Sequence, residues 1–333
     1  MLLIKASKTA DNIAGVGVQA IDDFGFVSKR GRMVEILLST FNGEEFLVEQ
    51  LDSLLGQTVK DIRIRIRDDG SSDNTTDILR SYQQKHPQMI LVEAGENLGY
   101  AKSFLTLLMN SGDADYYAFS DQDDVWFPDK IERAINSLSS LKDRPALYAS
   151  SFERVNEQLE TCGPPLMPKE ISFRSALVEC LTYGCTMVLN RVARDLIVAH
   201  NPTDLALTHD WWCYLVVAAV GDVIFDPRPS LKYRQHKNNN SGAPSGFFKS
   251  WLNRLNRLYK NRALTPWHRQ AIAVARLYKG QLTSEQLKTL NMIEDSKCSW
   301  YMRSQLALSS RIRRDKHLDD CLLRLLILLG AYS

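Results

Sequence analysis

Short apolar segments alternate with amphipathic helical patterns between residues 34 and 138, and this alternation limits the folds that the chain can adopt. Runs typical of buried strands lie at residues 34–38, 89–93 and 116–119, and residues 62–67 alternate Ile with Arg, the period of a strand with one polar face. The helical patterns between them lie at residues 44–57, 73–84, 100–109 and 128–138. We expect further strands at residues 146–152 and 185–189. Such alternation predicts an α/β fold with a Rossmann-like, mainly parallel sheet flanked by helices.

Three carboxylates gather directly after the fourth predicted strand, in the segment Ser120-Asp121-Gln122-Asp123-Asp124-Val125-Trp126. Like charges so close together repel one another and lose hydration on folding, so a folded protein needs a reason to keep them. A divalent cation supplies such a reason, because carboxylate oxygens suit Mg²⁺ or Mn²⁺. The alternative is a solvated acidic turn before the next helix.

Loops at the carboxyl ends of parallel strands are where sheets of this class bind ligands. Residues 39–43, 68–71 and 120–124 follow three of the predicted strands and contain small polar residues, glycines and carboxylates. Any one of these loops is explained equally well as a plain turn. Together on one sheet edge, they favour a nucleotide site.

Charge is divided unevenly along the 333 residues, although the net charge is only +2. Residues 232–333 hold 19 Lys and Arg against 6 Asp and Glu, a balance of +13, and the other residues hold 22 against 33, a balance of −11. The basic C-terminal third therefore predicts an anionic partner. Six cysteines without a C-x-x-C pair indicate a reducing cytosol, and no stretch reaches the ~18 apolar residues of a membrane span.

Residues 1–32 are polar and weakly periodic, and we expect a poorly ordered extension there. Residues 15–20 match the G-x-G-x-x-A dinucleotide pattern, but no predicted strand precedes them. A nicotinamide-dependent dehydrogenase is also disfavoured because the first strand–helix loop, residues 39–43, lacks a glycine-rich phosphate turn.

Four sequence motifs resemble those of the family-2 glycosyltransferases. They are Ser39-Thr40-Phe41-Asn42-Gly43, Asp68-Asp69-Gly70-Ser71, Asn97-Leu98-Gly99 and the carboxylate segment with Pro128-Asp129-Lys130. The match is closest to bacterial polysaccharide (O-antigen) rhamnosyl- and glucosyltransferases. The resemblance implies a GT-A fold over residues 33–240, a nucleotide-sugar donor, a divalent metal ion and inversion at the anomeric carbon. Residues 33–130 would bind the nucleotide sugar, and residues 131–240 the acceptor.

The resemblance also assigns expected roles to individual side chains of the donor half. Asp68 or Asp69 would hydrogen-bond the donor base in a pocket lined near Thr40. Asp121 and Asp123 would form a D-x-D pair that contacts ribose and metal. Asp124 would lie beside the donor sugar, with its own role left open.

The acceptor half offers a candidate base at the start of a predicted helix beginning near residue 208. An inverting transfer needs one base for the acceptor hydroxyl, and the family places a carboxylate at such a helix start, which points to Asp210. The alternatives are that Asp210 only complements the helix dipole, or that His209 is the base. Trp211 and Trp212 would stack on an acceptor sugar or belong to the core.

Residues 231–236 resemble a segment near the C-terminal boundary of the family domain. Arg234 and Lys232 would contact the diphosphate, and His236 would ligate the metal or a phosphate oxygen. A purely structural histidine is the alternative.

The remaining residues, 241–333, are predicted to form a basic helical region close to a membrane. Residues 248–259 place aromatic and leucine side chains on one helical face and surround them with basic residues, which fits an anionic membrane surface. The alternative is a helix packed on the catalytic domain. The preferred interpretation is a peripheral enzyme at the cytoplasmic face of the inner membrane, using a polyprenyl-diphosphate-linked acceptor.

From the sequence and the family resemblance, UDP-glucose is the favoured donor and dTDP-rhamnose is the alternative. From a different class, a nucleic-acid-binding protein would also explain the basic C-terminal third. No nucleic-acid-binding motif accompanies that charge, and the acidic N-terminal part would repel a phosphate backbone, so no nucleic-acid partner is expected.

Overall fold

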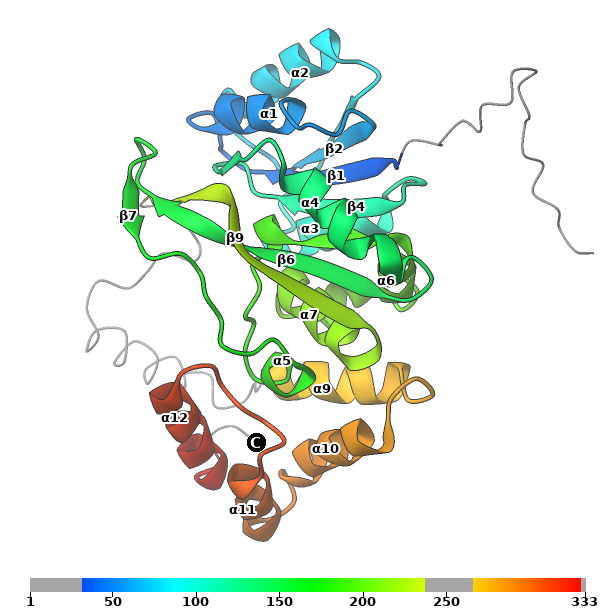
Figure 1. The fold of residues 1–333 in the computed structure, drawn as a ribbon, viewed down its shortest axis with the longest axis vertical. Coiled ribbons are helices and arrows are strands. Elements are labelled where there is room, and N and C mark those ends of the chain that lie inside the picture. The colour runs from blue at the N-terminus through cyan, green and yellow to red at the C-terminus, as the bar shows by residue number, and fades with distance from the viewer. Residues whose placement is uncertain (1–31, 237–265, 331–333) are drawn as a thin grey trace, which may run out of the picture. The chain divides into compact units, whose positions relative to one another are not determined.

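The computed structural model describes residues 32–236 and 266–330. The predicted extension before residue 32 and the predicted amphipathic helix at residues 248–259 lie outside these residues, and both stay predictions. Figure 1 shows the described elements coloured along the chain.

The N-terminal half of the sheet is parallel, as the alternating pattern predicts. Its central strand β1 (Val34–Thr40) pairs with β2 (Ile62–Asp68) on one side and with β4 (Tyr116–Ser120) on the other, and β3 (Ile90–Ala94) extends the sheet beyond β2. All three pairs are parallel, so the carboxyl ends of β1, β2 and β4 meet at one edge.

The second half of the sheet mixes strand directions, and the full order is β3-β2-β1-β4-β8-β6-β9-β5. Strand β8 (Val188–Asn190) is antiparallel to both β4 and β6 (Ala146–Val155), and β6 is parallel to β9 (Asp222–Arg234). The two-residue β5 (Val125–Trp126) pairs with β9, and β7 (Thr161–Gly163) pairs with β6. The predicted fold class, a mixed and mainly parallel α/β sheet, is confirmed.

Alternating side chains give the sheet two apolar faces, and a separate core lies on each. Ile36 and Leu38 of β1 belong to one core, whereas Leu37 between them belongs to the other. The first core also holds helices α1 (Leu47–Leu55) and α4 (Lys130–Leu138). The second holds α3 (Tyr100–Met109), α6 (Arg191–Val198) and α7 (His209–Val220).

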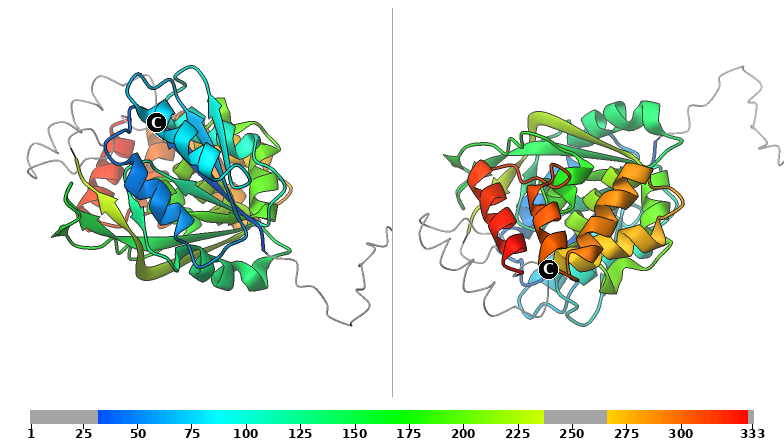
Figure 2. Two further views of the ribbon diagram at one scale, coloured as in Figure 1. Left: turned by 90° about the horizontal axis from the view of Figure 1, so that it is seen from above. Right: turned by 90° about the horizontal axis from the view of Figure 1, so that it is seen from below.

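The C-terminal helices continue the second core. Helix α9 (Pro266–Leu277) packs on α7, and α10 (Ser284–Asp295), α11 (Trp300–Leu308) and α12 (His317–Leu328) each pack on the helix before (Figure 2). The predicted helical extension is therefore confirmed for residues 266–328. Within the described part of the chain, no helix combines the length and the apolar character needed to traverse a bilayer.

The remaining elements are short. They are α2 (Thr75–Lys85), the single-turn α5 (Phe173–Ala176), and the 3-10 helices η1 (Ser139–Leu141), η2 (Gly184–Thr186) and η3 (Pro202–Asp204). The residue at the N-cap of α2 is Asn74, and Asp73 before it accepts a hydrogen bond from the Thr75 N–H at 3.0 Å.

Candidate active site

The loops after β1 and β2 are joined by hydrogen bonds through one buried carboxylate. Asp68 ends β2 and is 1 % exposed. Its carboxylate accepts hydrogen bonds from Thr40 Oγ1 at 2.9 Å, from the Ser71 N–H at 2.9 Å and from Ser71 Oγ at 2.6 Å. These bonds shape the edge where a nucleotide base is expected. Direct donor contacts of Thr40 and Asp68 stay predictions.

Asp69 fixes the next loop in a similar way. Its carboxylate accepts hydrogen bonds from the backbone N–H groups of Leu98 and Gly99 at 3.0 and 2.9 Å, and it is paired with the Arg67 guanidinium. Gly99 has a φ of 76°, a left-handed conformation that favours glycine. Asp69 thus connects the end of β2 to the start of α3, and its contact with the donor base also stays a prediction.

Gln122 attaches the carboxylate segment to the first loop. Its side-chain amide accepts a hydrogen bond from the Phe41 N–H at 2.8 Å and donates one to the Phe41 carbonyl at 3.1 Å. A Cβ atom at Gly43 would come closer than 3.0 Å to the Gln122 amide, so the absence of a side chain at Gly43 leaves room for that amide in its present position. The two loops that flank the expected nucleotide pocket are therefore held together.

The carboxylate cluster has a buried inner part. Asp124 is fully buried, and ligand atoms of Asp121, Asp124 and Cys185 all lie within 4.8 Å of one another. Burial raises the pKa of Asp121 and of Asp124 above the usual range, and the charge of Asp123 raises both further. The Lys130 ammonium lies in the same region, 3.5 Å from the centre of the Trp126 ring, and burial lowers its pKa to about 7.

Asp123 forms the outer part of the cluster together with the end of β9. Its Oδ2 lies 2.7 Å from Nε2 of His236. Arg234 donates from Nε to the Asp123 carbonyl at 2.9 Å and from its backbone N–H to Asp124 Oδ1 at 3.2 Å. Strand β9 therefore brings the predicted metal ligand His236 to the carboxylates from more than 100 residues away along the chain.

Asp210 lies in the first turn of α7 and is partly exposed. Its Oδ1 accepts a hydrogen bond from the Trp211 N–H at 2.8 Å, which orients the carboxylate at the helix start. Burial raises the pKa of Tyr100 and the charge of Asp210 raises it further; the same charge adds to the raised pKa of Asp121. The ring of His209, beside Asp210, lies 4.9 Å from the ring of Phe119 in β4, so the start of α7 packs next to the D-x-D segment.

Comparison with known proteins agrees with this arrangement. Residues 35–192 match the model of the family described as glycosyl transferase family 2. The "dTDP-rhamnosyl transferase RfbG" of Shigella flexneri is 32% identical over 247 residues, which cover 71% of this chain and 82% of the relative. The chain belongs to glycosyl transferase family 2.

Further relatives extend the family assignment. An Escherichia coli protein described as "UDP-Glc:alpha-D-GlcNAc-diphosphoundecaprenol beta-1,3-glucosyltransferase WfgD" is 26% identical over 191 residues, covering 57% of this chain and 70% of the relative. The crystal structure of S. aureus TarS 1-349 superposes with a TM-score of 0.53 at 15% identity, covering 90% of this chain and 80% of that one. The expected GT-A fold is therefore confirmed.

The burial of other side chains in this family-2 glycosyltransferase bears on their expected roles, and for the two tryptophans it favours the core over an acceptor sugar. Trp212 is fully buried and belongs to the core, so it has no ring face for an acceptor sugar. Trp211 packs against the same core and donates from its indole N–H to the Ala176 carbonyl at 2.7 Å. Asp124 is fully buried and accepts a hydrogen bond from the Arg234 backbone N–H, and its expected place beside the donor sugar stays a prediction.

Two further side chains, Arg234 and the alternative base His209, are also buried. Arg234 is 1 % exposed, and its guanidinium also reaches the Glu157 carbonyl and the Glu49 carboxylate, so it holds the carboxylate segment in place; its contact with a diphosphate stays a prediction. His209 is 4 % exposed and its ring stacks on Phe104 with 4.2 Å between ring centres. Burial lowers the pKa of His209 to about 4, which makes it unsuitable as a base near neutral pH.

Sequence reasoning missed the supporting residues Gln122, Lys130 and Cys185. Gln122 and Lys130 lie inside the family motifs, so their positions offered a signal. Cys185 lies within η2, far along the chain, and only the folded sheet brings it to the carboxylates.

Proposed function

We propose that this glycosyltransferase moves a sugar from a nucleotide sugar to a hydroxyl of a lipid-diphosphate-linked saccharide, with inversion of the anomeric carbon. The observation that supports the proposal is the packing of the start of α7 next to the donor-side loop: the ring of His209, beside Asp210, lies 4.9 Å from the ring of Phe119, two residues before Asp121. One carboxylate group suits the donor, and the other suits the acceptor hydroxyl. The product would be a growing bacterial surface polysaccharide.

In the proposed transfer, the Asp210 carboxylate accepts the proton of the acceptor hydroxyl. The hydroxyl oxygen forms the new bond to the anomeric carbon while the bond from that carbon to the diphosphate oxygen breaks. The nucleoside diphosphate leaves with the electron pair of that bond. Attack from the face opposite the leaving group inverts the anomeric centre, and one base is sufficient for this single displacement.

The proposed donor is dTDP-rhamnose, with UDP-glucose as the second candidate. The sequence motifs alone fit both. The RfbG relative is more similar and covers more of this chain than the WfgD relative, which shifts the preference from UDP-glucose to dTDP-rhamnose. The WfgD name contains a diphosphoundecaprenol, which supports a polyprenyl-diphosphate acceptor for this chain.

A divalent cation, Mn²⁺ or Mg²⁺, is proposed as cofactor. Asp121, Asp123 and His236 would hold it, since two carboxylates and one imidazole suit these ions and the Asp123–His236 pair is already assembled. The thiol of Cys185 is too soft a ligand for Mg²⁺, so the inner group of Asp121, Asp124 and Cys185 is less suitable. When bound, the cation would neutralise charge on the departing diphosphate.

We expect EDTA to abolish transfer and added Mn²⁺ or Mg²⁺ to restore it. Full activity in EDTA would contradict the proposed metal cofactor.

Replacement of Asp210 tests the proposal directly. We expect Asp210→Asn to lower kcat by about 10²–10⁴-fold, the usual contribution of a general base, and to leave donor KM nearly unchanged. Asp77→Asn is the matched control, because the Asp77 side chain is 73% exposed on α2. The measurement is transfer from dTDP-rhamnose and UDP-glucose to a lipid-diphosphate-linked sugar. Asp210→Asn activity within tenfold of the wild type would remove this residue as the base.

The cellular place of the reaction belongs to the same proposal. A lipid-linked acceptor would bring the enzyme to the cytoplasmic face of the inner membrane, where its basic C-terminal third would contact anionic lipids.

A further inference from the structure

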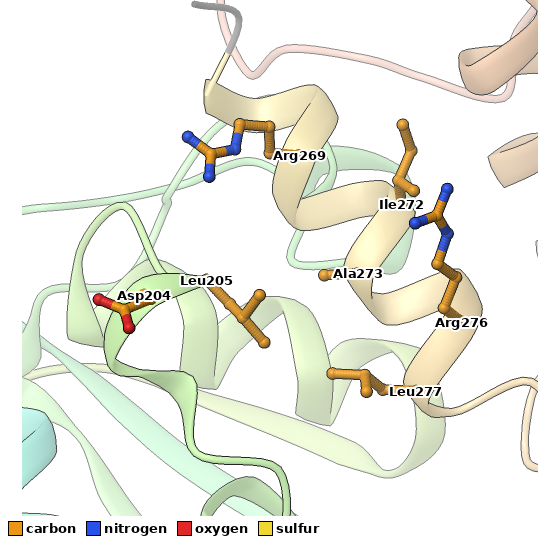
Figure 3. A pocket seen from close by; sticks show the side chains of 7 residues that line it. All are labelled: Asp204, Leu205, Arg269, Ile272, Ala273, Arg276 and Leu277. Carbon is orange, nitrogen blue, oxygen red and sulfur yellow. The ribbon is translucent and has the colours of Figure 1, made fainter.

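A cavity of about 360 Å³ lies between the segment that follows η3 and helix α9. Figure 3 shows Leu205 and Ala273 pointing toward one another across it, with Arg269 and Arg276 toward the two ends of the helix. None of these residues belongs to the carboxylate site described above. We call this cavity the α9 groove.

The α9 groove combines an apolar floor with cations at its rim. Leu205, Ile272, Ala273 and Leu277 supply the floor. Arg269, Ile272 and Arg276 are spaced at i, i+3 and i+7, so they lie on one side of α9. A ligand for such a surface needs an apolar chain and a negative charge in the same molecule.

The cations of the groove are available to a strong anion. Arg269 is exposed and has no ion-pair partner among the described residues. Arg276 pairs with Glu294 at 3.3 Å, where the side chains are 73% and 49% exposed. Asp204, the carboxylate of the lining, is 84% exposed and pairs with Lys102 outside the groove at 3.0 Å. Exposed pairs of this kind contribute little to stability, so a diphosphate competes easily with these carboxylates.

The groove also lies within reach of the candidate base. Leu205 precedes Asp210 by five residues, and a chain spans at most ~3.6 Å per residue, so their backbones are no more than about 18 Å apart. The Leu207 N–H donates to Gln270 Oε1 at 2.9 Å, which attaches this segment to α9.

We propose that the α9 groove binds the lipid-diphosphate end of the acceptor, with the diphosphate at Arg269 and Arg276 and the first isoprenoid units on Leu205 and Ile272. This inference rests on the proposed function, which supplies the lipid-linked acceptor. The groove would hold the acceptor by its lipid end while the sugar extends toward Asp210.

Binding of farnesyl diphosphate tests the groove without any need for transfer activity. We expect the wild-type protein to bind farnesyl diphosphate more tightly than inorganic diphosphate or farnesol, because only farnesyl diphosphate uses both the floor and the rim. Arg269→Ala with Arg276→Ala should weaken this binding by about tenfold or more, since two charge-assisted contacts are lost. Both side chains lie on the surface, so the double variant should fold.

Arg80→Ala is the matched control, because the Arg80 side chain is 69% exposed on α2 and also pairs with a neighbouring carboxylate. Equal affinity of the wild type and the double variant for farnesyl diphosphate would overturn the proposal. Inorganic diphosphate binding as tightly as farnesyl diphosphate would also overturn it, because the apolar floor would then have no part.

Kinetics separate the groove from the proposed function. The double variant should raise KM at least about tenfold for a lipid-diphosphate-linked acceptor and leave transfer to an octyl glycoside of the same sugar unchanged. If the enzyme transferred sugar to neither acceptor, the proposed function would be wrong. The farnesyl diphosphate assay would still show whether the α9 groove binds a lipid diphosphate. Normal transfer with an unchanged acceptor KM in the double variant would contradict the proposed role of the α9 groove and leave the proposed function intact.

Discussion

His209 shows how burial sets the behaviour of one ionisable side chain next to the candidate base. Its ring lies between Phe104 and Phe119, with ring centres 4.2 and 4.9 Å away. Burial lowers its pKa from 6.5 to about 4. The unfolded chain therefore takes up a proton below about pH 6.5, whereas the folded protein does not until about pH 4. The stabilising effect of the neutral ring is complete above pH 6.5 and is lost as the pH falls through this interval.

Replacement of His209 by Leu should remove this pH dependence. For a shift from 6.5 to about 4, the wild-type free energy of unfolding should fall by about 2 kcal/mol between pH 7.5 and pH 5 from this residue alone. His209→Leu should lack that part of the fall, as measured by urea unfolding at both pH values. His317→Asn, at an exposed position, is the control and should keep the wild-type dependence. An identical pH dependence in His209→Leu would show that the ring is not held neutral.

At the scale of strands, helices and loops, the sequence predicts well what depends on local periodicity. Helix α3 has the predicted bounds, and β1, β2 and β4 extend the predicted segments by only one or two residues. Strand β9 was not predicted, because Pro227 and Pro229 interrupt its pattern and its stability comes from pairing with the distant β6. The same limit applies to β5, which is two residues long.

In the candidate site, too, the features that depend on local sequence could be predicted, and those that depend on distant contacts could not. The loops and carboxylates could be predicted because they lie in contiguous motifs whose residue types suit a nucleotide and a metal. The buried positions of Asp124, Arg234 and Trp212 could not, because burial depends on which distant segments pack around a side chain. Helical spacing alone does not distinguish an aromatic side chain that faces a ligand from one that faces the core.

The attachment between the first loop and the carboxylate segment predicts a coupled effect of two substitutions. Gly43→Ala would force the Gln122 amide away from Phe41, because the new Cβ and that amide would occupy the same space. We expect donor KM to rise several-fold, with a stability loss of about 1–3 kcal/mol for two hydrogen bonds. Gln122→Ala should have a similar effect. In the Gln122→Ala background, Gly43→Ala should cost almost nothing more, and full additivity in this double-mutant cycle would contradict the attachment.

For the molecule as a whole, the C-terminal helices present more apolar surface than a solvated exterior requires. Leu318, Leu325 and Leu329 lie along one side of α12 and its C-terminal end, with exposed fractions of 68%, 52% and 69%. Leu326 and Ile327 are buried in the core, so α12 is apolar on two sides. Trp300 and Leu308 of α11 add further exposed apolar area. Acidic side chains nearby are paired with arginines, as in Asp320–Arg324 and Glu285–Arg311. This combination fits the proposed contact with an anionic membrane.

Replacing Leu318, Leu325 and Leu329 by Ser should therefore weaken binding to phosphatidylglycerol vesicles while the protein stays folded. Each partly inserted leucine contributes about 1 kcal/mol, so the affinity should fall about 100-fold in a co-sedimentation assay. Val48→Ser with Leu91→Ser removes exposed apolar side chains from the other end of the chain and should leave binding unchanged. Vesicle binding as tight as that of the wild type in the triple variant would show that these leucines do not contact the membrane. A wild-type dimer that the triple variant lacks, seen by light scattering without vesicle binding, would instead make the surface an interface between two copies of the enzyme.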